Sequence, residues 1–419
     1  MTRLLAIMGS GETAPTMIKP HRQLFERLGP PPVPAVLLDT PYGFQTNVDD
    51  ISARAVEYFS ASVGRPVDVA ILRRRDDDPV VRASALAKVA AAQWVFAGPG
   101  SPTYSLRQWR GTEVPQLLAD KLEHSGCVVF ASAAALTLGR YTVPVYEIYK
   151  VGAEPEWEEG LDLVQFLGPE VAVIPHYDNA EGGHHDTRFC YLGEGRLARL
   201  EDHMGPDGWV LGVDEHTGCF FDLDARTVSV VGNGTVTVRR EGKSVVIESG
   251  RTMPIDALVE MAFSDAGAAT GATSPVAGIE AAPDAPAAAP TALHGEIRRL
   301  EADFDGALAA LDVDGAVRAM LELDDTLLAW SGDTTQSDAG TRGRAAMRRM
   351  IARLGDLART GARHPREVVG GYVDALLDER AAARAGRRYE DADRIRDALI
   401  RCGIEVRDTP QGTAWELSG

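Results

Sequence analysis

The sequence predicts an α/β domain with a mostly parallel, doubly wound sheet, followed by a linker and a small, mainly α-helical domain. Over residues 1–263, short apolar runs rich in β-branched residues alternate with longer amphipathic stretches. This alternation is typical of right-handed strand–helix–strand crossovers. Residues 264–292 are rich in Ala, Pro, Gly and Thr and contain no aromatic residue, Arg or Lys. Such a segment cannot bury a core and predicts a flexible linker. Residues 293–419 have the pattern of helices almost throughout.

The strands of the first domain are expected, in chain order, at LLAIM, PAVLLD, VDVAIL, WVFAG, CVVFA and VAVIP. The stretches between them, such as TMIKPHRQLFERL and VPQLLADKLEHSG, are expected to be helices. Five strand-like runs then follow closely: WVLGVDE, GCFFDLD, TVSVVG, TVTVRR and KSVVIES. We expect these to form an antiparallel extension or edge of the same domain. After the linker, turns are expected near Gly332 and Pro365, and a hairpin at the end of the chain.

Length and composition limit the kinds of protein that this sequence can form. A chain of 419 residues with 45% hydrophobic and 25% charged residues predicts a globular protein of two domains. The net charge of −18 opposes nonspecific nucleic-acid binding over the whole surface, although residues 341–419 hold 16 arginines against 12 acidic residues. No run of eighteen apolar residues predicts a membrane-spanning helix. Four cysteines without a CxxC pair, and a start that does not fit an export signal, favour a cytoplasmic protein without structural disulfides.

The first strand is followed by a glycine-bearing turn. Gly9-x-Gly11-x-x-Ala14 fits the small-residue pattern that binds dinucleotides. Prolines disturb the helix that should follow, so we favour a tight turn and expect no cofactor. Loops after parallel strands nevertheless line the ligand crevice of such sheets, and Glu12 is therefore expected to face a site.

A serine directly follows another strand. CVVFA leads into Ser132, and a helix of small residues begins at once. Acyl transfer by serine needs an exposed oxygen, a base in hydrogen-bond reach and N–H groups aimed at the developing oxyanion. The strand–Ser–helix turn supplies the first, the Ala133 N–H is one oxyanion donor, and the loop with Gly98 and Gly100 could supply the second. The alternative is that Ser132 is a small residue at a packed junction.

Two further strand ends carry the partners that a serine nucleophile needs. His176 comes directly after VAVIP, and Asp214 and Glu215 end WVLGVDE. The chain order Ser, His, acid predicts a base and an acid that orients it. A metal site at His176, Asp178, His184, His185 and Asp186 is the alternative, but the spacing fits no defined motif and we expect no metal.

Residues 1 to about 250 resemble the cyanophycinase and peptidase E (aspartyl dipeptidase) family, which has a class I glutamine-amidotransferase-like fold. The resemblance is carried by the glycine loop at 98–100, the serine turn, PHYDNAEGGHHDTR and GVDEHTG. It implies that Ser132 is the nucleophile, His176 the base and Glu215 the orienting acid. It also implies a small peptide or aspartyl-containing substrate. Glutamine amidotransfer itself would use a cysteine at the turn, and Cys127 lies inside the strand.

The same resemblance suggests how a substrate is held. Arg188 is the candidate for gripping a substrate carboxylate, because its guanidinium matches that group in shape and charge. Asp178 and Glu12 complete the expected substrate-binding set. One departure matters: the family turn is Gly-x-Ser-Ala-Gly, whereas residues 130–134 read Phe-Ala-Ser-Ala-Ala. The missing glycines leave open a turn that does not present Ser132 for attack.

The end of the chain has a separate resemblance. ERAAAR, ADRIRDAL and GIEVRDTPQGTAW resemble the C-terminal region of cysteinyl-tRNA synthetases, and the helices from about residue 293 match the anticodon-binding bundle of those enzymes more loosely. The HIGH and KMSKS motifs of a synthetase do not occur in this sequence. The resemblance implies a helical module that contacts RNA, with tRNA as the expected partner, through phosphate pairing and base stacking. The candidate contacts are Arg380, Arg384, Arg387, Arg388, Arg394 and Trp415.

Two hypotheses therefore stand. The first is a cytoplasmic serine hydrolase of the peptidase E and cyanophycinase type with an appended helical module. The second is a catalytically inactive amidotransferase-like protein whose C-terminal module binds tRNA. The alternative for that module is a structural role in packing or dimerisation. In the second case the protein would be a homodimer.

Overall fold

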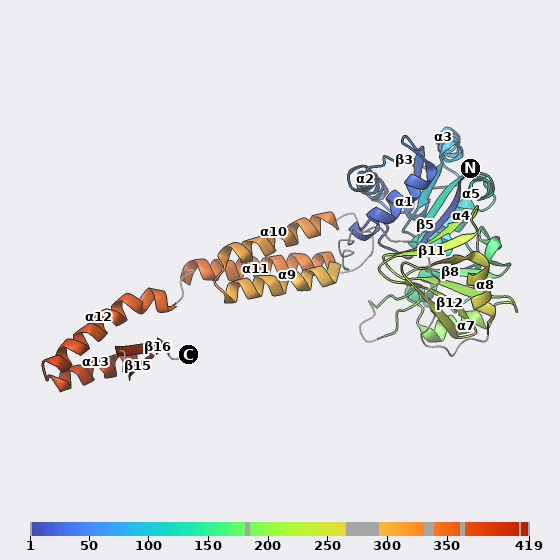
Figure 1. Ribbon diagram of the computed structural model, residues 1–419. Helices are drawn as coiled ribbons and strands as arrows, with labels where there is room; N and C mark the ends of the chain where they lie inside the picture. Colours follow the sequence, from blue (N-terminus) through green and yellow to red (C-terminus); the bar gives the residue numbers. More distant parts are fainter. Residues whose placement is uncertain are drawn as a thin grey trace. The chain divides into compact units, whose positions relative to one another are not determined.

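The computed structural model describes residues 2–180, 185–264, 293–330, 339–360, 365–409 and 412–417. The chain divides into two compact units, Met1–Glu296 with Asp325–Arg342, and Ile297–Asp324 with Gly343–Gly419 (Figure 1). The predicted linker at 264–292, apart from Ser264, lies outside the described residues. So do Gly332 and His184. The division at the linker therefore stays a prediction.

The first unit contains an eight-stranded sheet in the order β14-β11-β10-β1-β5-β4-β2-β3. Its parallel strands are β1 (Arg3–Met8), β2 (Ala35–Leu38), β3 (Asp68–Ala70), β4 (Trp94–Ala97) and β5 (Gly126–Ala131). Three antiparallel strands extend it beside β1: β10 (Thr217–Asp222), β11 (Thr227–Gly232) and β14 (Thr252–Pro254).

A second, six-stranded sheet has the order β13-β12-β9-β8-β6-β7. Here β6 (Tyr141–Thr142), β8 (Val171–Ile174) and β9 (Trp209–Val213) run parallel. Antiparallel edges are formed by β7 (Glu158–Glu159), β12 (Thr235–Arg240) and β13 (Lys243–Glu248). The closely spaced strands predicted at 209–248 thus lie in this unit, but they are divided between two sheets, and β9 continues the parallel part through β8.

Helices cover both faces of the eight-stranded sheet, as a doubly wound sheet requires. Alternate residues of β1 show this: Leu4 and Ala6 belong to one core cluster and Leu5 and Ile7 to the other. The helices of the first unit are α1 (Ile18–Leu28), α2 (Val48–Glu57), α3 (Pro79–Ala91), α4 (Pro102–Trp109), α5 (Val114–Glu123), α6 (Ser132–Leu136), α7 (Glu194–Glu201) and α8 (Ile255–Phe263). Helices α1 and α2 pack on the face with Leu4, and α3, α5 and α8 on the face with Leu5.

The C-terminal part of the chain is helical, as predicted. It comprises α9 (Leu293–Ala309), α10 (Val313–Ala329), α11 (Ala339–Thr360), α12 (Pro365–Ala385), α13 (Tyr389–Arg401), and a hairpin of β15 (Ile404–Thr409) and β16 (Gly412–Leu417). The last two helices and the hairpin share a small core, formed by Val373, Leu377, Leu399, Ile404, Val406 and Trp415. In the part of the chain that the structure describes, no helix is long and apolar enough to cross a bilayer.

Candidate active site

Strand ends from both sheets converge on one place. Ser132 follows β5 in the first sheet, while His176 and Glu215 follow β8 and β9 in the second. The His176 N–H donates to the Gly9 carbonyl, 3.3 Å away, just after β1. A Cβ at Gly9 would lie 2.0 Å from the Asp214 carbonyl oxygen. The first glycine of the predicted turn therefore permits a close approach of two strand ends, which is the physical reason for glycine there.

Three side chains form a hydrogen-bonded series at this point. Ser132 Oγ lies 2.9 Å from His176 Nε2, and His176 Nδ1 lies 2.8 Å from Glu215 Oε1. A carboxylate only accepts hydrogen bonds, so Nδ1 carries a proton and donates it to Glu215. In a neutral imidazole Nε2 is then the acceptor, and it receives the Ser132 hydroxyl proton. The three side chains predicted from strand ends are thus brought into mutual contact.

The serine lies on a sharp turn. Ser132 has a φ of +50° and is the first residue of α6. Left-handed backbone is costly for a residue with a side chain, and it is typical of a nucleophile presented between strand and helix. Phe130, which stands where the resembling family has glycine, is fully buried and packs against Trp109 with ring centroids 5.7 Å apart. The bulky residue points into the core, so it leaves the turn intact.

The predicted oxyanion residues surround the serine. Ala133 is the second residue of α6, and the first N–H groups of a helix have no partner within it. The Gly98 carbonyl accepts the Ala134 N–H at 3.2 Å, which ties the loop after β4 to the same helix. Gly100 has a φ of +141°, and a Cβ there would lie 1.9 Å from the Pro41 carbonyl oxygen. Ser101 then caps α4 by accepting the Tyr104 N–H. Backbone contacts of Gly98 and Gly100 and the Ser101 hydroxyl together fix this loop.

Carboxyl groups behind His176 differ in their pKa. Burial would raise the pKa of Glu215, but the hydrogen bond and charge of His176, together with the Asn179 amide, lower it below its ordinary value. Desolvation and the neighbouring Asp214 carboxylate raise the pKa of Asp178 to about 6, against the effect of the Glu215 N–H that it accepts. Burial also raises the pKa of Asp214. At neutral pH Glu215 is therefore the ionised group that faces the imidazole.

The predicted substrate-binding residues have three different surroundings. Glu12 is only 1% exposed, and one carboxylate oxygen lies 3.2 Å from the position of a Cβ at Gly98. Arg188 is exposed and pairs with Asp186, with Nε–Oδ1 and Nη2–Oδ2 distances of 2.9 and 2.8 Å. The Asp178 carboxylate accepts the Glu215 backbone N–H at 2.8 Å. This contact ties Asp178 to the backbone of Glu215, and its substrate-binding role stays a prediction.

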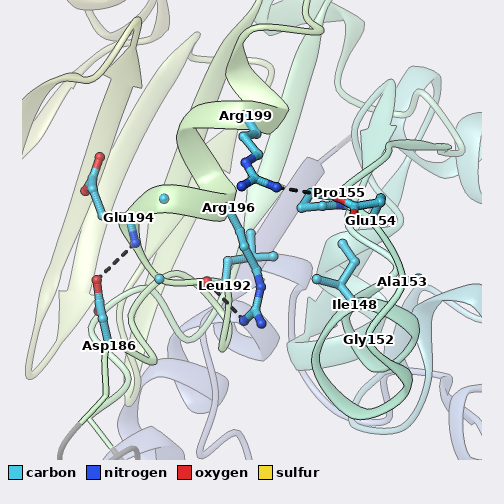
Figure 2. Close-up of a pocket in the computed structure, with 12 residues that line it drawn as sticks. Ile148, Gly152, Ala153, Glu154, Pro155, Asp186, Leu192, Glu194, Arg196 and Arg199 are labelled. Atoms are coloured by element: carbon cyan, nitrogen blue, oxygen red, sulfur yellow. Dashed lines mark hydrogen bonds and ion pairs between the residues drawn. The ribbon is translucent and has the colours of Figure 1, made fainter.

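A cleft of about 510 Å³ has Asp186, the partner of Arg188, in its lining. Figure 2 shows Arg199 reaching from α7 to Glu154 of the segment at 148–155, whereas Arg196 bends back to the Leu192 carbonyl, 3.5 Å from its Nη1. Leu192 in the wall of the cleft directly follows Tyr191, whose ring centroid lies 6.5 Å from that of His176. Among the residues that line this cleft are charged groups of both signs, but not Ser132, His176 or Glu215.

Sequence reasoning missed several residues here. Asn179 donates to Glu215 Oε1 at 3.2 Å, and His216 Nδ1 lies 3.1 Å from Thr16 Oγ1. Asn179 is three positions after His176, and that proximity was the available signal. Residues 189–191 all have positive φ without being glycine, and the Cys190 N–H donates to the His176 carbonyl at 3.0 Å. No sequence pattern marks such a turn. Among the described residues, three close metal-type ligands occur in an exposed group at the end of α5, formed by Asp120, Glu123 and His124.

The C-terminal residues predicted to contact RNA divide into two groups. Trp415 is 8% exposed, and its Nε1 donates to Asp374 at 2.9 Å. Arg380 is buried as well, and it forms a bidentate pair with Asp408 at 2.8 and 2.9 Å. The prediction that these two side chains face RNA needs correction, because both hold the module's own core and hairpin. The other group is exposed and consists of Arg384, Arg387, Arg388 and Arg394. Of these, Arg384 also donates to Asp408.

Comparisons with known proteins agree with both resemblances. Residues 369–415 match the cysteinyl-tRNA ligase anticodon binding domain. A cysteine–tRNA ligase of Pelobacter propionicus is 32% identical over 173 residues, 36% of this chain and 34% of the ligase. That of Salinibacter ruber is 59% identical over 44 residues, 10% of this chain and 8% of the ligase. The chain thus spans about a third of the length of the first of these relatives and less of the second.

The first unit has a structural relative. The crystal structure of a peptidase from an acI-B1 Actinobacterium aligns with a TM-score of 0.50 and 19% identity, covering 61% of this chain and 97% of that chain. At this identity the likeness shows the fold. The class defined here is an α/β protein whose first unit shares the fold of this peptidase, joined to a C-terminal segment similar to the cysteinyl-tRNA ligase anticodon-binding domain.

Proposed function

We propose that this protein is a serine hydrolase of the peptidase E and cyanophycinase type that acts on a small peptide or aspartyl-containing substrate. The observation that carries the proposal is the series Ser132–His176–Glu215, with contacts of 2.9 and 2.8 Å, on a serine with left-handed backbone. Nucleophile, base and orienting acid in this geometry are what acyl transfer by serine needs.

The proposed reaction follows from the geometry. Ser132 Oγ attacks the substrate carbonyl carbon while His176 Nε2 takes the hydroxyl proton. Glu215 stabilises the imidazolium, and the Ala133 N–H with the glycine loop binds the oxyanion. The C–N bond then breaks as His176 returns the proton to the leaving amine, which yields an acyl-enzyme. Water, deprotonated by His176, attacks the ester and releases the acid and free Ser132.

The substrate class rests on the resemblance and on charge. The cleft in Figure 2 is lined by arginines and carboxylates, which suits a short peptide with charged groups. For Arg188 to grip a substrate carboxylate, that carboxylate would exchange with Asp186, a half-exposed partner. A small charged peptide is therefore the substrate class that the resemblance and the charges near Arg188 favour.

The test is turnover of a library of dipeptides and aspartyl peptides, followed by mass spectrometry. We expect wild-type cleavage and a loss of at least about 10³-fold in Ser132→Ala. The members that are cleaved would define the pocket. Cleavage that persists in Ser132→Ala at the wild-type rate would refute the proposal.

A second candidate function is tRNA binding by the C-terminal module. The match of residues 369–415 to an anticodon-binding domain favours it, and so do the exposed side chains of Arg387, Arg388 and Arg394. We expect salt-sensitive tRNA binding by the full chain. Replacing the three arginines by alanine should reduce the slope of log K against log salt by about 2 to 3. Arg226→Ala, an exposed arginine of the first unit, is the control. Equal salt slopes for all variants would argue against this role.

A further inference from the structure

Two consecutive residues of the loop after β8 contact the same acid. The Asp178 carboxylate accepts the Glu215 backbone N–H at 2.8 Å, and Asn179 Nδ2 donates to Glu215 Oε1 at 3.2 Å. Oε1 is also the oxygen that accepts the His176 Nδ1 proton at 2.8 Å. The loop that carries His176 thus holds both the backbone and the carboxylate of Glu215.

Asn179 is itself held firmly. It is 1% exposed, its N–H donates to the His176 carbonyl at 3.2 Å, and its own carbonyl accepts the Thr187 hydroxyl at 3.4 Å. The orientation of its amide is set by its partner, because a carboxylate accepts and only the NH₂ group can donate. A buried amide in this place costs free energy unless its hydrogen bonds are satisfied.

We propose that Asn179 is a positioning residue that fixes the Glu215 carboxylate in the plane where His176 donates, with Asp178 fixing the backbone of the same glutamate. Two donors that converge on one oxygen prevent the carboxylate from rotating away from the imidazole. A freely rotating carboxylate would let the ring turn and would weaken the preference for the tautomer with a proton on Nδ1. The effect on turnover rests on the proposed hydrolase function; the effect on the imidazole does not.

The kinetic test compares Asn179→Ala and Asn179→Asp with wild type, each alone and with Glu215→Gln. Asn179→Ala should lower kcat by about 10- to 100-fold with KM nearly unchanged. Asn179→Asp keeps the size but sets two carboxylates against each other, so its loss should be larger. Neither change should lower kcat further in the Glu215→Gln background, because Asn179 acts through that carboxylate. Additive losses in that background would overturn the proposal.

A matched control removes a similar contact elsewhere. Gln165 Nε2 donates to the Asp162 carboxylate at 2.8 Å on the exposed surface, and Gln165→Ala should leave kcat unchanged. The folded fraction of each variant is measured by circular dichroism, and kcat is expressed per folded enzyme. A loss that vanishes after this correction would show a purely structural role and would overturn the proposal.

A second measurement needs no substrate. In the full-length protein labelled with ¹⁵N-histidine, the His176 Nδ1 proton is assigned by its loss in His176→Ala. This proton should be protected from exchange in wild type and in Gln165→Ala, and exchange at least about tenfold faster in Asn179→Ala. Unchanged exchange in Asn179→Ala would refute the positioning role even if the enzyme cleaves peptides. Faster exchange without peptide cleavage would support it while the proposed substrate class fails.

Discussion

The site around Ser132 and the C-terminal module of α12, α13 and the hairpin use charged groups in opposite ways. Near His176, burial raises the pKa of Asp214, and desolvation together with the Asp214 charge raises the pKa of Asp178. In the module, arginines hold the pKa values of Asp408 and Asp391 below the ordinary range. Carboxyl groups with raised pKa values in one place are typical of functional sites, whereas exposed ion pairs with arginine are common on surfaces and add little stability.

The largest effect is expected from Glu215→Gln. The amide keeps the shape of the acid but removes its charge, and it can no longer fix the His176 tautomer. We expect kcat/KM to fall by about 10³- to 10⁴-fold with little change in unfolding free energy, and tRNA binding to stay the same. Asp256→Asn, which removes a carboxylate from an exposed pair with Arg226, is the control. Peptide cleavage at the wild-type rate in Glu215→Gln would remove the acid from the proposed mechanism.

Phe130→Ala tests whether the phenylalanine belongs to the core or to the site. Its side chain is fully buried against Trp109, so the substitution should cost about 3–5 kcal/mol of unfolding free energy. Denaturant unfolding measures the loss, and peptide turnover at low temperature measures the activity of the folded fraction. Faster turnover with unchanged stability would mean that the missing family glycine limits the turn, contrary to the geometry described here.

The elements were largely predictable, and the approach of the two sheets was not. Alternating apolar runs marked nearly every long strand, and Ser132, His176 and Glu215 were identified because each directly follows a strand. The second sheet depends on pairings such as β8 with β9 and β9 with β12, which only tertiary packing decides. The sequence predicted a tight turn at Gly9. It did not show why glycine is needed there, which is the close approach of the Asp214 carbonyl.

The C-terminal module shows the opposite pattern. Its sequence resemblance was dense and its secondary structure regular, so helices and hairpin were correctly expected. The individual side chains were harder, because an arginine on a helix gives no sign in sequence of whether it points to solvent or to Asp408. Trp415 was expected to stack on a base, but the hairpin turns its ring into the core. The secondary structure of this module was predictable from its sequence pattern. The exposure of individual side chains was not, because it depends on partners that are distant in sequence.

Ser132→Gly should separate stability from activity. The left-handed φ of +50° costs a residue with a side chain about 1 kcal/mol, which glycine does not pay. Relative to Ser132→Ala, the glycine variant should unfold about 2–4 °C higher by calorimetry, and both should lack activity. Equal melting temperatures for the two variants would mean that the turn is relaxed and that the strain argument fails.

The smallest expected effect is a pH response of opposite sign in the two regions. The folded-state pKa of Asp178 is raised to about 6, so between about pH 4 and 6 the folded chain binds a proton that the unfolded chain has lost. This group therefore stabilises the fold most below pH 4, and its contribution falls as the pH rises through that window. The pKa of Asp408 is lowered, so its contribution is present above about pH 4 and is lost as the pH falls further.

Peptide-resolved hydrogen exchange from pH 3.5 to 7, corrected for intrinsic rates, measures both regions in one protein. Protection near residues 171–180 should rise toward low pH in wild type and change less in Asp178→Asn. Protection in β15 should fall toward low pH, and Asp408→Asn should reduce it already at pH 7, because Arg380 then lacks its bidentate partner. The same direction of change in both regions would mean that the contrast between desolvated and arginine-paired carboxylates does not govern these two parts of the molecule.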